Sequence, residues 1–388
     1  MKLELTATST FGLEAVVRRE IEALGYKVIR TEDGRVTYMG DERAIVRSNL
    51  WLRSADRVYL CMGEFEAKEF EELFQQTKAL EWESIIPLEG AFPVVGGSVK
   101  SALHSVPACQ KIIKKAVSTR LGEFYCREKL PETGAEYRIR FIAHKDRFLL
   151  LLDASGVGLH KRGYRVQDTA APMKETLAAA LVQLSFYRKD RVLVDTCCGS
   201  GTIPIEAALI ARNIAPGLNR SFASEGWEFI ADEIWKEERK AAYEAADFDS
   251  ELHITGMDID KRAIRAAKAN ADEAGVTDDI DLVCMDMTNW DIGAGIPKGA
   301  SKDEYGVVIS NLPYGIRIGD DRANKEIYAH FRELMDDCPN WSFFLITADK
   351  NIERELGRKA DRRRKLYNGQ IETQFYQFHG ARPERNHE

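Results

Sequence analysis

The stretch that most constrains the fold runs from Val192 to Thr202 and reads VLVDTCCGSGT. Its short apolar run indicates a strand buried on both faces, as in a parallel sheet that is covered by helices. Gly199 and Gly201 allow a sharp turn and a close ligand approach, because glycine has no Cβ. Residues 202–211 then have the pattern of a helix whose first amides point back at the turn. This order predicts a Rossmann-like sheet that holds a nucleotide-like ligand at its carboxyl edge.

The glycine pair alone leaves three interpretations open: an NAD enzyme, a methyltransferase or a structural strand–helix unit. The full dinucleotide pattern is absent, because Ile203 and Pro204 follow the second glycine. Asp195 lies directly before the turn, and its carboxylate repels a pyrophosphate but accepts hydrogen bonds from an amine or a cation. The stretch therefore favours S-adenosylmethionine as the ligand.

Strands and helices alternate through the second half of the chain. We expect strands at residues 253–258, 280–284, 305–310 and 341–347, and helices at 173–186, 261–274 and 322–336. Asn368-Gly369 between two apolar runs is a strong hairpin signal. A terminal antiparallel hairpin on a parallel sheet is typical of the seven-stranded class I methyltransferase domain, whereas an NAD-binding sheet has no reason for one. The predicted fold class is α/β, with this domain at residues 167–388.

The first half reads as an α+β region of shorter elements. Strands are expected at 3–9, 27–29, 35–38, 57–65, 91–97, 136–143 and 147–153, and helices at 13–24, 42–49, 69–80 and in the second part of 98–117. We divide it into a small α+β unit at residues 1–64 and a second module at 65–166. Residues 213–250 form an irregular insertion with Trp227 and Trp235, which is either a lid or a packed excursion.

Charge is distributed unevenly in this chain of net charge −7. Residues 96–165 hold 14 Lys and Arg against 6 Asp and Glu, whereas residues 64–93 hold 8 Glu against 2 Lys. The basic segment is either a solvated face or a nucleic-acid contact. In the second interpretation, the side chains that contact phosphates are Lys100, Lys111, Lys114, Lys115, His160, Lys161, Arg162 and Arg165.

Composition excludes several other classes. The longest apolar run, residues 148–152, is too short to cross a bilayer, and the N-terminus has no apolar signal core, so we expect a cytoplasmic protein without membrane association. The seven cysteines include no C-x-x-C pair, and the seven histidines have no metal-ligand spacing. Cys197 and Cys198 are interpreted as small buried residues, and no metal site is predicted.

Acidic residues end three successive predicted strands, and the carboxyl ends of parallel strands share one sheet edge. Asp195 precedes the loop for the methionine part, Asp258 can accept both ribose hydroxyls, and Asp286 can accept from the adenine amino group. One such residue is ordinarily a solvated cap, but three in order indicate a cofactor site. The expected cofactor contacts are Pro172, Asp195, Thr196, Cys197, Gly199, Ser200, Gly201, Thr202, Asp258, Ile259, Asp286, Met287 and Asn311.

The motif Asn311-Leu312-Pro313-Tyr314 follows the fourth strand and carries the predicted chemistry. The Asn311 side-chain oxygen and the Leu312 carbonyl can accept both hydrogens of an exocyclic base amine, while Tyr314 can stack on an extruded base. Transfer is then an in-line displacement on a sulfonium that depends on positioning and charge stabilisation. The same four residue types also form ordinary β-turns, but the place of this motif at a strand end favours a catalytic role.

The motifs together resemble the THUMP-domain, class I S-adenosylmethionine-dependent RNA methyltransferases, in particular the bacterial 23S rRNA guanine-N2 methyltransferases. The matching segments are residues 101–108, 159–165, 171–177, 195–202 and 311–315. The resemblance covers nearly the whole chain and implies a ferredoxin-like unit, an RNA-binding THUMP module and a catalytic domain. Leu312 replaces the first of two prolines in the family motif, and its backbone carbonyl preserves the role. Some relatives carry a second methyltransferase domain, whereas this sequence ends after the first hairpin. We therefore expect this chain to catalyse one modification.

Three alternatives remain open at this point. The same motif serves adenine-N6 methylation of DNA, and a tRNA guanine is a possible substrate in place of an rRNA guanine. From another class, the chain could be a non-catalytic RNA-binding assembly factor with a vestigial cofactor fold, although intact Asp195, Asp258, Asn311 and Tyr314 argue against it.

Overall fold

The computed structural model describes residues 1–167, 173–293, 300–313 and 321–382. These residues form two compact units, neither of which is one continuous segment. The N-terminal unit comprises residues 1–9, 17–159 and 220–241, and the C-terminal unit comprises 10–16, 160–219 and 242–388. Each unit therefore includes a short segment from the other half of the chain. Within the described residues, no helix is both long enough and apolar enough to cross a membrane.

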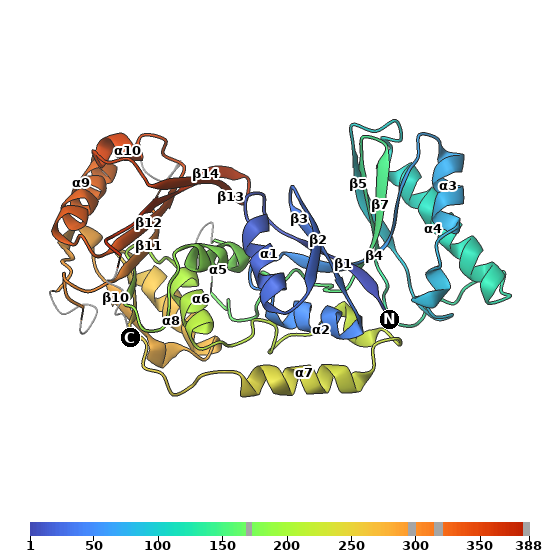
Figure 1. Ribbon diagram of the computed structural model, residues 1–388, viewed down its shortest axis with the longest axis horizontal. Helices are drawn as coiled ribbons and strands as arrows, with labels where there is room; N and C mark the ends of the chain where they lie inside the picture. Colours follow the sequence, from blue (N-terminus) through green and yellow to red (C-terminus); the bar gives the residue numbers. More distant parts are fainter. Residues whose placement is uncertain (168–172, 294–299, 314–320, 383–388) are drawn as a thin grey trace. The chain divides into compact units, whose positions relative to one another are not determined.

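The N-terminal unit is built on one seven-stranded sheet in the order β2-β3-β1-β4-β7-β6-β5. The described strand pairs are antiparallel except β5 with β6. The strands are β1 (Leu3–Thr8), β2 (Lys27–Glu32), β3 (Arg35–Gly40), β4 (Arg57–Glu66), β5 (Val94–Val99), β6 (Ile139–His144) and β7 (Arg147–Asp153). The helices are α1 (Glu14–Ala23), α2 (Glu42–Trp51), α3 (Phe70–Lys78), η1 (Trp82–Ser84) and α4 (Val106–Phe124). The two modules predicted for the first half thus share one continuous sheet (Figure 1).

The insertion is packed in its middle part, not a lid. Residues 220–241, which include η2 (Ala223–Gly226) and the first part of α7 (Asp232–Glu244), belong to the N-terminal unit. Trp227 is 1% exposed and stacks on Tyr137 at a centroid distance of 5.4 Å, and its Nε1 donates to the Glu136 carbonyl at 3.1 Å. Of the two sequence interpretations, the packed excursion is therefore correct for this part.

The C-terminal unit contains a second seven-stranded sheet in the order β10-β9-β8-β11-β12-β14-β13. Its first five strands pair in parallel, and β14 and β13 are antiparallel. The strands are β8 (Leu193–Asp195), β9 (Ile254–Asp258), β10 (Ile280–Cys284), β11 (Val307–Asn311), β12 (Ser342–Thr347), β13 (Arg362–Asn368) and β14 (Ile371–Phe378). The predicted fold class is confirmed, and Gly369 supplies the positive φ of 63° that the predicted hairpin turn requires.

Helices cover both faces of this sheet. They are α5 (Glu175–Leu184), α6 (Thr202–Ala211), α8 (Lys261–Glu273), η3 (Thr277–Asp279), η4 (Met287–Asn289), α9 (Asp321–Asp337) and α10 (Ile352–Glu355). Successive strand residues point to opposite faces, so Val307 and Ile309 pack in the core with α5, α6 and α8, whereas Val308 packs in the core with α9 and α10. The order of the strands places the point where the connections reverse direction between β8 and β11.

Candidate active site

The loop after β8 makes the predicted tight turn into α6. Gly199 and Gly201 have positive φ values of 55° and 83°, and Gly201 is the N-cap of α6. A Cβ at Gly201 would lie 3.0 Å from the Ala267 Cβ of α8, so both conformation and space require glycine there. The turn leaves the first amides of α6 without partners in the helix, and such amides suit an anionic or polar ligand group.

Asp195 ends β8 in a fully buried position. Its Oδ1 accepts the Cys197 N–H at 3.1 Å, whereas its Oδ2 has no hydrogen-bond partner among the described residues. Burial raises the pKa of Asp195 to about 8, and the Cys197 N–H and the nearby Ser310 hydroxyl oppose this shift only in part. A buried carboxyl oxygen without a partner is costly, so this position favours a ligand that brings a cationic or amine donor.

Asp258 lies at the end of the neighbouring strand and is tied to the loop. Its Oδ2 accepts the Gly199 N–H and its Oδ1 accepts the Asp260 N–H, each at 2.9 Å. A carboxylate has about four acceptor positions, so each oxygen retains capacity for a ligand hydroxyl, as the ribose prediction requires. Ile259 follows and is 70% exposed, which leaves an apolar group open beside this carboxylate.

The third strand end supports a less direct role. Asp286 caps η4, because its Oδ1 accepts from the Thr288 N–H at 3.0 Å and from the Thr288 hydroxyl at 2.8 Å. Met287 is 4% exposed, and its side chain packs in the core under the sheet. Any contact of Met287 with a ligand would therefore come from its backbone.

Asn311 ends β11, on the other side of β8. Its Oδ1 is buried and has no hydrogen-bond partner among the described residues. Leu312 is 1% exposed and donates its N–H to the Ile346 carbonyl at 3.1 Å, which holds the start of the motif against β12. Tyr314 and Pro172, two of the predicted site residues, lie outside the described residues, and Pro313 is half-buried.

Ser310 joins the two halves of the site, and sequence reasoning missed it. Its Oγ accepts the Thr196 N–H at 2.9 Å and lies 2.8 Å from the Thr196 Oγ1. The bond links the end of β11 directly to the start of the glycine loop. The sequence shows only that a serine follows the apolar run 307–309, which suggests that Ser310 is buried. It does not show that Thr196 is the hydrogen-bond partner of this serine.

The remaining loop side chains point into the protein. Cys198 is buried and Cys197 is half-buried, and loss of solvation raises the pKa of the Cys197 thiol above its ordinary range. Ser200 and Thr202 are 4% and 5% exposed, and their hydroxyls lie 3.3 and 3.1 Å from the guanidinium of Arg165. A ligand would therefore meet this part of the loop mainly through its backbone.

Two of the predicted RNA contacts are corrected by the structure. The Arg162 side chain is 3% exposed and its Nε lies 3.4 Å from the fully buried Glu206 carboxylate. Arg165 is 14% exposed and pairs with Glu175 at 2.9 Å. A guanidinium that is buried with its own carboxylate cannot contact RNA phosphates without losing that partner, so both arginines are internal.

The other predicted RNA contacts differ in how open they are. Lys100, Lys111 and Lys115 of the N-terminal unit and Lys161 of the C-terminal unit are exposed, and His160 is half-buried. Lys114 is half-buried: its Nζ pairs with Glu132, donates to the Phe92 carbonyl at 3.2 Å and lies 3.6 Å from the Phe92 ring centroid. Lys114 thus has internal partners that the sequence pattern did not indicate.

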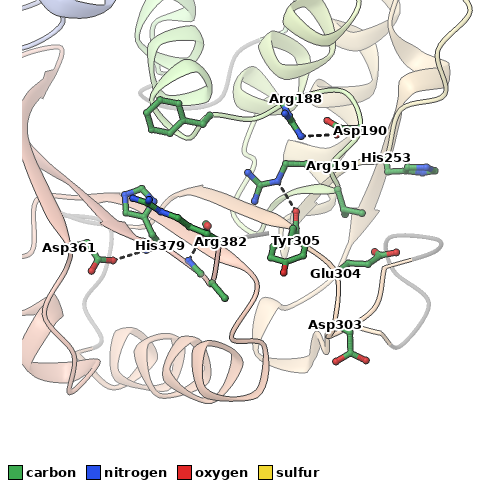
Figure 2. A pocket seen from close by; sticks show the side chains of 15 residues that line it. Arg188, Asp190, Arg191, His253, Asp303, Glu304, Tyr305, Asp361, His379 and Arg382 are labelled. Carbon is green, nitrogen blue, oxygen red and sulfur yellow. Dashed lines mark hydrogen bonds and ion pairs between the residues drawn. The ribbon is translucent and has the colours of Figure 1, made fainter. Parts of the chain in front are cut away.

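A separate cavity of about 1370 Å³ lies at the opposite edge of the C-terminal sheet. Its lining includes Val192 and His253, which directly precede β8 and β9, and Tyr305, two residues before β11. Figure 2 shows its mixed charges, with Arg188 paired to Asp190 at 2.9 Å and Arg191 donating to the Tyr305 carbonyl at 2.7 Å. Ligands of parallel α/β sheets bind at the carboxyl edge, so this cavity is distinct from the candidate site.

The candidate site fits S-adenosylmethionine. The arrangement offers an unpartnered buried carboxyl oxygen at Asp195, hydroxyl acceptors at Asp258, a glycine turn at a helix N-terminus and an exposed apolar side chain at Ile259. These groups match an ammonium, a ribose, a carboxylate and a flat ring respectively.

Comparisons with known proteins match most of the chain. The family model described as "RMKL-like, methyltransferase domain" covers residues 162–377, the THUMP domain covers 67–153, and the RlmL ferredoxin-like domain covers 4–59. A Bacillus subtilis (strain 168) protein named "Putative RNA methyltransferase YpsC" is 46% identical over 387 residues, which are 99% of this chain and 98% of that protein.

Solved structures of similar sequence share the fold over nearly the whole chain. A Listeria monocytogenes protein named "predicted N6-adenine-specific DNA methylase" is 46% identical with a TM-score of 0.90, covering 98% of this chain and 97% of its own. The structure of "SMU.472, a putative methyltransferase complexed with SAH" is 43% identical with a TM-score of 0.91, covering 99% of both chains. The resemblance drawn from the motifs is confirmed: the chain belongs to the RMKL-like methyltransferase family, with an RlmL-type ferredoxin-like domain and a THUMP domain before the catalytic domain.

Proposed function

We propose that this protein transfers a methyl group from S-adenosylmethionine to the exocyclic N2 amine of a guanine in RNA, with 23S rRNA as the substrate. One observation carries the proposal: the buried Asn311 Oδ1 has no partner among the described residues. It lies at the end of β11, which Ser310 links to residues 196–202, the segment after β8 that we call the cofactor loop. An acceptor in that position is suited to a donor that arrives with the substrate.

The chemistry follows from what this chain's own groups can accept. Asn311 Oδ1 and the Leu312 carbonyl can take the two N–H donors of an exocyclic amine, which directs the nitrogen lone pair away from the ring. The cofactor supplies a methyl group on a sulfonium, so that a C–N bond forms as the C–S bond breaks and the amine releases one proton. Fixed acceptors lower the barrier because they are oriented before the reaction begins.

An RNA substrate is supported by the THUMP domain and by the relative whose name is that of an RNA methyltransferase. The exposed lysines at 100, 111 and 115 in the same unit provide cations for phosphate contacts. The resemblance to the bacterial 23S rRNA guanine-N2 methyltransferases supports rRNA over tRNA, whose guanine amine would undergo the same reaction.

The rival proposal is adenine-N6 methylation of DNA. It is supported by the printed name of the Listeria relative and by the chemistry, since Asn311 and Leu312 can serve any exocyclic amine. The two relatives are each 46% identical to this chain, so similarity does not choose between their names.

Product analysis separates these proposals. The purified protein would be incubated with methyl-labelled S-adenosylmethionine in three parallel reactions. One would contain rRNA from cells that lack the gene, one tRNA and one genomic DNA. Each product would then be digested to nucleosides and identified by mass spectrometry. We expect N2-methylguanosine in rRNA alone, and N6-methyladenine in DNA would contradict the proposal. Failure of the protein to bind the cofactor in calorimetry would instead support a non-catalytic assembly factor.

A further inference from the structure

Arg165 connects three segments around the cofactor loop, all of them in the C-terminal unit. Its Nε donates to Glu175, the first residue of α5, at 2.9 Å, and its Nη2 donates to the carbonyl of Met173, two residues before that helix, at 2.8 Å. The same guanidinium reaches Ser200 Oγ at 3.3 Å and Thr202 Oγ1 at 3.1 Å in the loop. One planar cation therefore holds the loop against α5 and against its own linker.

Asn270 of α8 makes a second connection to the same loop residue. Its side chain is fully buried, and its Nδ2 donates to the Ser200 carbonyl at 3.0 Å and to the Gln167 carbonyl at 2.9 Å. Its Oδ1 accepts the Val166 and Gln167 N–H groups, each at 3.0 Å. The amide uses both donors and both acceptor positions, so its orientation is fully determined.

These contacts meet at Ser200, one residue before the glycine that starts α6. The loop has two glycines with positive φ, and such a segment has many conformations available unless neighbouring groups restrain it. Arg165 restrains the Ser200 and Thr202 side chains, and Asn270 restrains the Ser200 backbone. A loop that is held in its binding conformation before the ligand arrives binds more tightly, because less order must be created on binding.

We propose that Arg165 and Asn270 are positioning residues of the cofactor site, acting through Ser200 and Thr202 rather than by touching the ligand. The proposal rests on the cofactor assignment but not on which nucleotide is methylated. It replaces the RNA contact that the basic sequence around Arg165 suggests. It predicts that loss of either residue weakens cofactor binding by up to about tenfold, the upper end of what one hydrogen bond contributes.

The test compares Arg165→Met with a matched arginine at the other end of α6. Arg212 is 13% exposed, pairs with Asp279 and donates to the Asp247 carbonyl at 3.0 Å, so Arg212→Met removes a similar bridge away from the loop. Calorimetric titration of the full-length variants with S-adenosylhomocysteine gives Kd, and thermal unfolding gives Tm. We expect both variants to lose Tm, but only Arg165→Met to lose affinity, by up to about tenfold.

Conservative variants separate positioning from charge. Arg165→Lys retains a cation for Glu175, but a compact ammonium cannot also contact Ser200 and Thr202. The affinity of this variant for S-adenosylhomocysteine should therefore be about as low as that of Arg165→Met. Asn270→Asp keeps the acceptors and removes both donations, and it should weaken binding in the same way. In turnover assays, KM for the cofactor should rise while kcat at saturation stays near that of the wild type.

Distinct results would overturn distinct claims. Equal loss of affinity in Arg165→Met and Arg212→Met, or wild-type affinity in Arg165→Lys, would show that the loop is not positioned in this way. If Arg165→Met does not fold, Arg165→Lys and Asn270→Asp decide the question. Absence of cofactor binding by the wild-type protein would instead overturn the cofactor assignment itself.

Discussion

The Gly199 amide donates a hydrogen bond of 2.9 Å to Asp258 Oδ2, which joins the glycine turn to the end of the neighbouring strand. The bond has two consequences for the site. It fixes the turn at a residue whose φ is 55°, and it orients the carboxylate that we expect to bind the ribose. The loop after β8 and the end of β9 are thus held together by a direct hydrogen bond.

Replacing Asp258 should therefore cost more than a ribose contact. We expect Asp258→Ala to weaken S-adenosylhomocysteine binding by at least about tenfold, because both the ligand acceptors and the restraint on Gly199 are lost. Calorimetric titration measures the effect. The matched control is Asp281→Ala, which removes an exposed carboxylate from the adjacent strand β10 and should leave Kd unchanged. Similar losses in both variants would contradict a specific role for Asp258.

Asn311→Ala separates transfer from cofactor binding. Removing an acceptor that acts on the transferred amine should reduce kcat by about 10²–10³-fold, in the range seen when one oriented polar group is removed from an active site. Kd for S-adenosylhomocysteine should change little. A parallel loss of Kd and kcat would mean that Asn311 serves the cofactor and not the amine. The assay is methyl incorporation into rRNA at saturating cofactor.

Cofactor binding should release a proton from Asp195. Burial raises the pKa of this carboxyl to about 8, so in the free protein it is mostly protonated at pH 7. A bound ammonium stabilises the carboxylate and lowers that pKa. We expect proton release near pH 7 that fades above about pH 9, where the group is already ionised. Titration in buffers with different ionisation enthalpies measures it, and Asp195→Asn should abolish it.

The same group should affect the pH dependence of folding in the free protein. Between the ordinary pKa of 3.8 and about 8, the folded state holds more protons on Asp195 than the unfolded state does. The stability from the protonated group is thus fully present below pH 3.8 and is lost as the pH rises toward 8. Urea unfolding from pH 5 to about pH 9 should show a smaller decline in Asp195→Asn than in the wild type. Identical slopes would mean that Asp195 is ionised when free.

Trp227 tests the contribution of the insertion to the N-terminal unit. Its ring is fully buried against Tyr137, so Trp227→Ala should destabilise that unit by about 3–5 kcal/mol. Equilibrium urea unfolding measures the loss. Tyr243, which is 66% exposed at the end of α7, provides the control, and Tyr243→Ala should change stability by less than about 0.5 kcal/mol. A small effect of Trp227→Ala would mean that residues 220–241 are not part of that core.

Lys111 and Lys115 test the RNA surface, because both are exposed on α4. The double variant Lys111→Ala with Lys115→Ala should weaken RNA binding and reduce the slope of log K against log salt by roughly 1 for each lost phosphate contact. Lys2→Ala removes an exposed lysine of the same unit, directly before β1, and should leave both the affinity and the salt dependence unchanged. Unchanged affinity in the double variant would mean that the basic segment is only a solvated face.

Short stretches of sequence were enough to predict the order of strands and helices in the catalytic domain. The apolar run, the turn glycines and the acidic residue at Asp195 are properties of neighbouring residues, as are the hairpin at Asn368-Gly369 and the motif at Asn311. Parallel strands bring their carboxyl ends to one edge, so this alternation of elements was enough to place Asp195, Asp258 and Asn311 near one another.

The partners of polar side chains were decided only by tertiary structure. Arg162, Arg165 and Lys114 stand in a basic stretch that reads as a surface, yet the fold brings Glu206, Glu175 and Glu132 against them from 44, 10 and 18 residues away. A sequence shows which residues carry charge but not which charges lose their water. Burial depends on the packing of distant segments, and that packing gives Arg165, a predicted RNA contact, internal partners at Ser200 and Thr202 instead.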